Sequence, residues 1–197
     1  NNDQLNWEKF IVLFQKNKSV GGILFIVSFS IANRFFEILK WQSLVAHLRK
    51  ITLSEATAQV LGALTAGIFT PNGLGEYAGK AFFFEKSMTK KIVFLNLICN
   101  GIQMIITVVF GIFGLLYFNA NFNIITSKTV SVLFGLLVVV FLIIFSLKKI
   151  KIKGYSIEKL IHKINEIPKP IHKKNVLLGL SRYLVFSHQY YFLFLAF

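Results

Sequence analysis

The chain has 197 residues, of which 55% are hydrophobic and only 15% are charged, against about 25% charged in soluble domains. A domain of this size cannot bury so many apolar side chains, so we exclude a disordered chain, a disulfide-rich secreted scaffold and an ordinary cytosolic enzyme. The net charge of +14 comes from basic residues that lie between apolar runs, as in the loops of membrane proteins, so nucleic-acid binding is not expected.

The N-terminal part of the chain predicts an interfacial helix followed by a first membrane span. Residues 1–19 mix aromatic and charged side chains, as in a helix that lies on a membrane surface. The apolar stretch from Val20 to about Leu39 is long enough to cross a hydrocarbon core of about 30 Å. Trp41 is expected to be an interfacial aromatic residue, and residues 40–50 are expected to form a basic loop.

Residues 53–85 predict a broken or re-entrant helical hairpin. Thr52-Leu-Ser-Glu55 is a capping-box pattern, and the helix that it starts is expected to end near Phe69. The run Thr70-Pro-Asn-Gly-Leu-Gly75 breaks this helix, and a second short helix is expected over residues 76–85. Each piece is short for a full crossing, which favours re-entry, although a hairpin that crosses and returns fits the charge distribution equally well.

Further apolar segments follow the hairpin. Residues 92–118 and 130–147 predict two membrane spans joined by a short polar loop. Residues 148–174 carry nine lysines and two glutamates, which predicts a basic cytoplasmic loop. Within it, residues 157–164 have the spacing of an amphipathic interfacial helix, which two prolines are expected to end. Residues 176–197 open a last span.

The predicted fold is therefore an all-α polytopic membrane protein, a transmembrane helix bundle with the hairpin inside it. Residues 1–197 are expected to form a single transmembrane domain. We further expect the chain to be a fragment of a longer protein, lacking spans at both ends.

Polar and ionisable side chains inside apolar spans are costly, so each group of them predicts a functional site. The groups are Ser30, Asn33, Arg34, Glu37 and Trp41; the run from Thr70 to Lys80; Asn96, Asn100, Gln103, Thr107 and Gly111; and Arg182, Ser187, His188 and Gln189. Arg34 is spaced to pair with Glu37, and Glu76 with Lys80. Arg182 has the chemistry to bind a phosphate or a carboxylate such as Glu76. The alternatives are that the cations reach to water, that the break is an ordinary loop, and that the amides join neighbouring helices.

Enzyme signatures are absent from the sequence. It contains no HExxH, CxxC, G-x-S-x-G or Walker A pattern. Asp3 is the only aspartate, which excludes an intramembrane aspartyl dyad. We therefore expect no enzyme activity, no metal and no cofactor in this chain.

Four ordered motifs resemble those of a known membrane-protein family. The first span resembles an N-x-x-x-E-x-x-K-W signature through Asn33-Arg-Phe-Phe-Glu37-Ile-Leu-Lys-Trp41. The hairpin is similar to a G-x-x-T-P-x-x-x-G-E-x-x-G-R core through Gly67-Ile-Phe-Thr70-Pro-Asn-Gly-Leu-Gly75-Glu76-Tyr-Ala-Gly79-Lys80. Two further motifs are similar at Asn100, Gln103, Thr107 and Gly111 and over Ser181-Arg-Tyr-Leu-Val-Phe186-Ser-His-Gln189. The family is the lysylphosphatidylglycerol synthase transmembrane region, which includes the flippase domain of the multiple peptide resistance factor.

The resemblance implies a multi-pass protein of the bacterial inner membrane that moves a phospholipid or lipid-linked substrate between leaflets. Lys80 departs from the arginine that many members have there, keeping the charge but losing bidentate phosphate geometry. The expected substrate-binding residues are Asn33, Arg34, Glu37, Thr70, Pro71, Gly75, Glu76, Lys80, Asn100, Gln103, Arg182 and Gln189. The expected partners are the bilayer and this lipid, and a homo-oligomer is compatible with the sequence. The alternatives are the membrane portion of an enzyme or accessory subunit that acts on lipid-linked substrates, and a structural membrane subunit.

Overall fold

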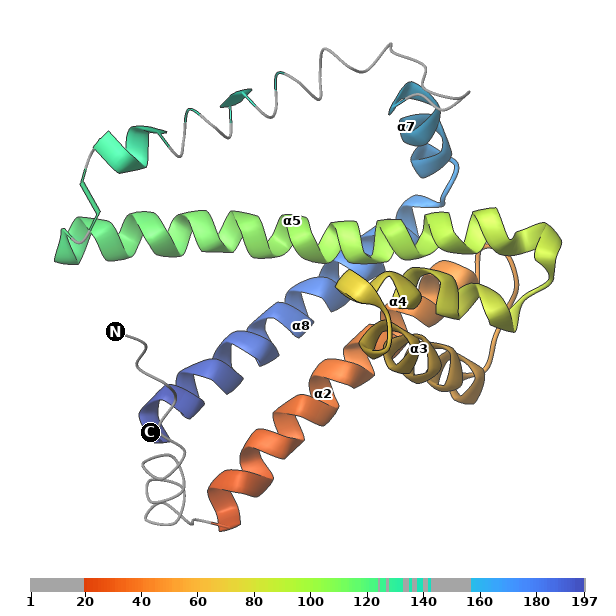
Figure 1. Ribbon diagram of the computed structural model, residues 1–197, viewed down its shortest axis with the longest axis horizontal. Helices are drawn as coiled ribbons and strands as arrows, with labels where there is room; N and C mark the ends of the chain where they lie inside the picture. The colour runs from red at the N-terminus through yellow and green to blue at the C-terminus, as the bar shows by residue number, and fades with distance from the viewer. Residues whose placement is uncertain are drawn as a thin grey trace. The chain divides into compact units, whose positions relative to one another are not determined.

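The structure is a computed structural model that describes residues 20–123, 125, 126, 128–132, 135, 138, 139, 142 and 157–196. This described part is helical and contains no strand (Figure 1). Its main helices are α2 (Val20–Val45), α3 (Leu53–Ile68), α4 (Leu74–Gly79), α5 (Thr89–Phe122), α7 (Ile157–Asn165) and α8 (Lys169–Ala196). Short 3₁₀ turns are η1 (Pro71–Gly73), η2 (Lys80–Phe83) and η3 (Lys86–Met88). The predicted interfacial helix in residues 1–19 and most of the predicted span 130–147 lie outside the described residues.

The chain divides into two compact units. One contains residues 1–103 and 173–197, and the other contains residues 104–172. The first unit holds α2, the α3–α4 hairpin, the N-terminal part of α5 and most of α8. The charged side chains predicted inside the spans all belong to this first unit.

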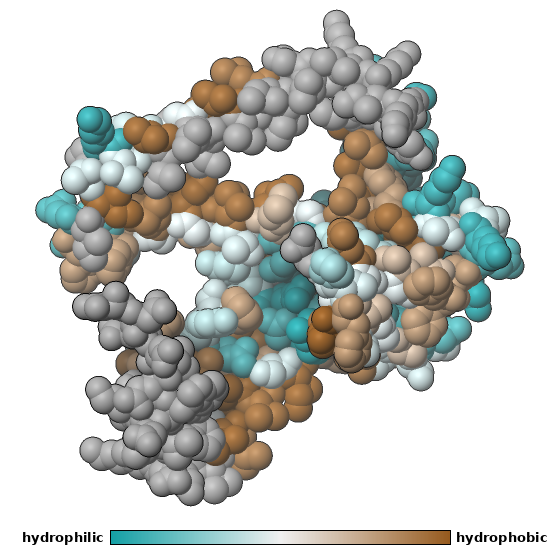
Figure 2. All heavy atoms as spheres, in the orientation of Figure 1, coloured by the Kyte–Doolittle hydropathy of each residue, from teal (hydrophilic) through white to brown (hydrophobic). Residues whose placement is uncertain are grey.

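Two of the described helices are long and apolar enough to cross a membrane, over Gly21–Val45 and Lys86–Phe122. Protein covers little of them, since 17% and 28% of their most apolar windows are buried. Large side chains such as Leu24, Ile31 and Phe113 are exposed on them. Figure 2 shows that hydrophobic residues cover much of the visible surface. Such extended apolar surfaces are stable in contact with other apolar groups and not with water.

Helix α2 continues beyond the predicted end of the first span. It runs to Val45, so Lys40 and Trp41 lie inside the helix. Both side chains are fully buried, with relative exposures of 0%. The prediction of a basic loop that begins at Lys40 is therefore wrong, and Trp41 packs inside the first unit. The apolar pattern ended at Leu39 because a lysine interrupts it, whereas the fold gives that lysine buried acceptors.

The capping box at the start of α3 is confirmed. The Glu55 backbone N–H donates to Thr52 Oγ1 over 3.2 Å, and the Thr52 backbone N–H donates to Glu55 Oε2 over 2.7 Å. The two bonds satisfy backbone donors that a helix start leaves without partners. They fix the point at which the hairpin begins.

The break after α3 is also confirmed, with different boundaries. Thr70 Oγ1 donates toward the carbonyl oxygens of Ala66 and Gly67 and accepts the Gly75 N–H over 2.6 Å. Gly73 has φ +69°, a left-handed conformation that side chains disfavour. Helix α4 therefore starts at Leu74, before the predicted residue 76, and gives way to the 3₁₀ turn η2 at Lys80.

Helices α3 and α4 lie against each other with almost no space between their backbones. A Cβ at Gly75 would overlap the Ala66 carbonyl oxygen and lie 2.6 Å from Thr70 Oγ1. A Cβ at Gly79 would lie 2.8 Å from Ala63 Cα. These glycines permit the close approach and bring the end of α4, with Lys80, against the buried side of α3.

We expect Thr52→Ala to lower the free energy of unfolding by about 1 kcal/mol, the usual cost of losing an N-cap side chain. Unfolding in mild detergent, followed by circular dichroism, measures the loss. Hydrogen bonds from the Thr52 backbone N–H and hydroxyl, with the Arg49 charge as a smaller contribution, hold the pKa of Glu55 below its ordinary 4.5. The contribution of Glu55 is therefore complete above pH 4.5 and is lost as the pH falls through the lowered pKa. Thr52→Ala with the wild-type free energy of unfolding, or wild-type stability that does not fall as the pH is lowered below 4.5, would contradict the prediction.

The second unit contains the predicted amphipathic helix. Helix α7 ends at Asn165, ahead of Pro168, as predicted. Pro170 does not end it but lies in the first turn of α8, where a missing N–H costs little. Helix α8 therefore begins at Lys169, well before the predicted start of the last span at residue 176.

Candidate functional site

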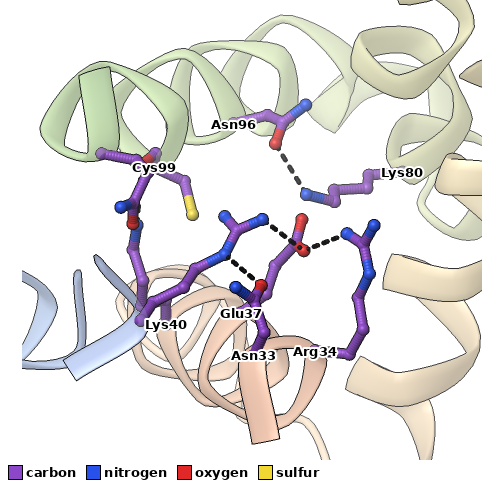
Figure 3. Close-up of polar contacts among 9 residues, drawn as sticks. Asn33, Arg34, Glu37, Lys40, Lys80, Asn96 and Cys99 are labelled. Atoms are coloured by element: carbon purple, nitrogen blue, oxygen red, sulfur yellow. Dashed lines mark hydrogen bonds and ion pairs between the residues drawn. The ribbon is translucent and has the colours of Figure 1, made fainter. Parts of the chain in front are cut away.

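One face of α2 collects the polar side chains of the candidate site. Asn33, Glu37 and Lys40 follow one another at intervals of three or four residues and so share a face of the helix. All three are buried, with relative exposures of 8%, 4% and 0%. Figure 3 shows them pointing toward α5 and the residues after α4. We define the charged cluster as Arg34, Glu37, Lys40, Lys80 and Arg182.

Glu37 lies between two arginines. Arg34 Nη1 contacts Glu37 Oε2 at 2.8 Å, and Arg182 Nη2 from α8 contacts the same oxygen at 3.1 Å. Arg182 Nε also donates to Asn33 Oδ1 over 2.9 Å. The predicted Arg34–Glu37 pair is thus confirmed, and Arg182 pairs with Glu37 rather than with the predicted Glu76. A carboxylate that accepts from two guanidiniums fixes both cations in position.

Lys80 is fully buried beside this ion pair. Its Nζ donates to Asn96 Oδ1 over 2.8 Å and lies 4.7 Å from the centre of the Trp41 ring. Asn96 Nδ2 donates to the Glu76 carbonyl oxygen, and Trp41 Nε1 donates to Gln59 Oε1 over 2.7 Å. The predicted Glu76–Lys80 ion pair is wrong, because the 3₁₀ turn at Lys80 directs its side chain to Asn96 on α5.

Lys40 reaches a different pair of acceptors on α5. Its Nζ donates to the Cys99 carbonyl oxygen over 3.1 Å and to Gln103 Oε1 over 3.2 Å. Gln103 is therefore correctly predicted to face the interior. Lys40 is a cluster residue that the sequence interpretation missed. Its position three residues after Glu37 was a usable signal, since that spacing places both on one face.

Helices α2 and α8 run antiparallel and meet mainly through long side chains. Beyond Arg182, Gln189 Nε2 donates to Ser30 Oγ over 2.6 Å, and Phe192 packs edge-on against Phe25 with ring centres 4.9 Å apart. Residues later in α8 thus meet residues earlier in α2. Gln189 therefore helps to join the helices at some distance from Glu37 along α2.

The formal charge of the cluster is strongly positive. It contains four cations and one carboxylate, a formal charge of +3. In Figure 2 hydrophilic residues gather near the point where α2 and α8 come together, with hydrophobic residues around them. Unbalanced cations in a low-dielectric region are costly, and an anion would offset that cost.

The predicted site residues fall into separate groups. The structure brings Asn33, Arg34, Glu37, Lys80, Gln103 and Arg182 together. Thr70, Pro71 and Gly75 instead build the turn and the close contact between α3 and α4. Among the contacts of the described residues, none joins the Glu76 carboxylate or Asn100 to the charged cluster. Small residues recur at every fourth position of α3, at Ala58, Gly62 and Ala66; Gly62 and Ala66 lie close to other side chains and backbone, whereas Ala58 is exposed.

Asn96 and Trp41 were singled out in the sequence but not assigned to the site. Asn96 is fully buried and holds Lys80, so its position in the polar stripe of α5 was a valid signal. The Trp41 ring lies against Lys80 Nζ. Trp41 follows Glu37 by four residues, so the spacing already placed it on the same face of α2. No group of metal-ligating side chains occurs among the residues that the structure describes.

Comparisons of the sequence with protein-family models, with curated proteins and of the fold with solved structures find no match. The resemblance to the flippase-like family is therefore an interpretation of the motifs alone. A function for the chain is best inferred from the chemistry of the charged cluster.

Proposed function

We propose that this chain is a multi-pass protein of the bacterial inner membrane that translocates a phospholipid or lipid-linked substrate between leaflets. The observation that carries the proposal is the surplus of cations in the charged cluster, on and beside two helices of membrane-crossing length. Charged side chains inside a membrane are expensive and mark pathways for ions or substrates. A lipid phosphate is the anion that a bilayer supplies in quantity.

The α3–α4 hairpin supports the same proposal. Broken helices beside a polar site are a recurrent feature of transporters, because non-helical backbone is tolerated where protein or water covers it. Helix α3 is about 24 Å long, at 1.5 Å for each of its 16 residues. We propose that the hairpin is re-entrant and that Lys80, buried at the end of α4, adds positive charge beside the substrate path.

The burial of Lys40 and Lys80 favours a second candidate, a structural membrane subunit. Both side chains have a relative exposure of 0%, and their Nζ atoms donate hydrogen bonds to protein groups. In that case the cluster would hold α2, α5 and α8 together and would bind no lipid. The two candidates differ in whether removal of a cluster cation changes transport or stability.

Leaflet-resolved lipid scrambling tests the proposal. The purified protein is reconstituted into liposomes containing phosphatidylglycerol, phosphatidylethanolamine and a trace of fluorescent phosphatidylglycerol, and quenching of the outer leaflet is followed with time. We expect wild-type protein to scramble lipid and Lys80→Met to scramble about tenfold more slowly. The matched control is Lys169→Met, an exposed lysine at the start of α8.

Lys80→Met also separates the two candidates when stability is measured beside transport. The change removes a buried charge but leaves the buried Asn96 Oδ1 without its donor, so the free energy of unfolding is expected to fall by about 1–3 kcal/mol under either candidate. Under the proposed function scrambling also falls in protein that is still folded, whereas a structural subunit loses stability alone. Wild-type protein that is folded and inactive, or Lys80→Met that scrambles at the wild-type rate, would overturn the proposal.

A further inference from the structure

The two arginines of the charged cluster are arranged around a single point. Both approach the same carboxylate oxygen, Glu37 Oε2, at 2.8 and 3.1 Å. Two guanidiniums held by one oxygen are close enough for a second small oxyanion to bridge them. Glu37 therefore acts as an internal template that fixes the separation of the two cations.

The arginines keep donors that Glu37 does not use. A guanidinium has five N–H groups. The described residues accept one hydrogen bond from Arg34 and one from Arg182 Nε, and Arg182 Nη2 forms an ion pair with Glu37. The remaining N–H groups match the planar fork that binds phosphate oxygens bidentately.

The side chains of the two arginines are partly exposed to solvent, whereas those of the two lysines are not. The side chains of Arg34 and Arg182 are 43% and 20% exposed, whereas Lys40 and Lys80 are fully buried. A ligand would thus contact the arginines, and the buried lysines would contribute positive charge without touching the ligand. Lys80 is close enough to Glu37 to interact electrostatically with it, which adds to the positive potential at the arginines.

The formal charge then indicates the charge of the ligand. With a cluster charge of +3, a phosphodiester of charge −1 leaves two positive charges uncompensated, and a phosphomonoester of charge −2 leaves one. A zwitterionic headgroup has no net charge and compensates none of the three positive charges, and an aminoacylated headgroup adds a further positive charge. Electrostatic attraction at close range grows with each unit of charge.

We infer that the charged cluster binds a phosphomonoester dianion through Arg34 and Arg182 and discriminates against headgroups that carry a cationic nitrogen. This inference rests on the proposed function, because it assigns the ligand of the same site. It names the chemistry of the terminal group, which a lipid headgroup and free phosphate share.

Binding to the detergent-solubilised full chain at pH 8 tests the inference, since a phosphomonoester is then doubly charged. The probes are short-chain phosphatidate, phosphatidylglycerol, phosphatidylcholine and lysyl-phosphatidylglycerol, with inorganic phosphate as a separate arm. We expect phosphatidate to bind about tenfold more tightly than phosphatidylglycerol, and phosphatidylcholine and lysyl-phosphatidylglycerol, whose headgroups carry a cationic nitrogen, to show no saturable binding. Inorganic phosphate that binds as tightly as phosphatidate would assign the site to free phosphate, whereas much weaker binding would assign it to a lipid.

Charge-conserving variants identify the site. Arg34→Lys and Arg182→Lys keep the charge but lose the bidentate fork, so the preference for phosphatidate is expected to fall in both. The matched control is Arg49→Lys, an exposed arginine outside the cluster. Equal affinity for the monoester and the diester, or a preference that both cluster variants retain, would overturn the inference.

The outcomes also separate this inference from the proposed function. Selective binding without scrambling would support the phosphate site and refute translocation. Scrambling without any headgroup preference would support translocation and refute the phosphate site.

Discussion

Glu37→Ala is expected to lower the free energy of unfolding by about 1–3 kcal/mol, less than the cost of breaking a fully buried ion pair, because the side chains of Arg34 and Arg182 are 43% and 20% exposed. The change removes the one carboxylate of the charged cluster and leaves Arg34 and Arg182 beside two buried lysines. Equilibrium unfolding in mixed detergent micelles measures the loss. The structure places most of that cost in the first unit, because Arg182 is what ties α8 to Glu37 on α2.

The control for Glu37→Ala is Glu166→Ala. Glu166 also contacts a basic side chain, His162 at 3.1 Å, but the side chains of Glu166 and His162 are 58% and 78% exposed. Solvent screens such a pair, so the expected loss is at most about 1 kcal/mol. Adding Arg182→Met to Glu37→Ala is expected to recover part of the stability, because it removes one of the orphaned cations. Equal losses at Glu37 and Glu166 would show that the cluster is not electrostatically coupled.

Gly75→Ala is expected to disrupt the hairpin, at a cost of about 3 kcal/mol, the upper part of the range for overpacking. The new methyl group would overlap the Ala66 carbonyl oxygen, which is backbone and cannot turn away. The displaced α4 would carry Lys80 away from Asn96, so phosphate binding is expected to fall together with stability. Thermal unfolding followed by circular dichroism measures the change.

Gly101→Ala serves as the matched control for Gly75→Ala. Gly101 lies inside α5, and a Cβ there meets nothing within 4 Å. Alanine has a higher helix propensity than glycine by about 1 kcal/mol, so this control is expected to be neutral or stabilising. A loss of stability in Gly75→Ala together with no loss or a gain in Gly101→Ala would confirm the close packing of α3 on α4. A loss at Gly101 as large as that at Gly75 would contradict it.

Local sequence signals predicted the helical elements well. The capping box at Thr52 and the break after Thr70 depend on neighbouring residues and backbone angles, which the sequence encodes directly. The faces of α2 and α5 that carry polar residues also followed from spacing. The end of α2 was missed because Lys40 and Trp41 resemble interfacial residues until a partner helix buries them.

Partner choice within the site was the part that sequence did not determine. Spacing along one helix predicted that Glu76 pairs with Lys80, but Lys80 binds Asn96 on another helix. Arg182 and Asn33 are 149 positions apart and still form a hydrogen bond. No local pattern encodes such a contact, because it depends on how α8 lies along α2.

The sequence by itself determined that the chain is apolar and helical, where the hairpin breaks, and which helix faces carry charge. These properties follow from composition, from backbone preferences of proline and glycine, and from the periodicity of a helix. The tertiary structure decided which charges meet, since that depends on helices brought together from distant parts of the chain. It thereby gathered four cations around one carboxylate, and the proposal of an anionic ligand rests on this imbalance.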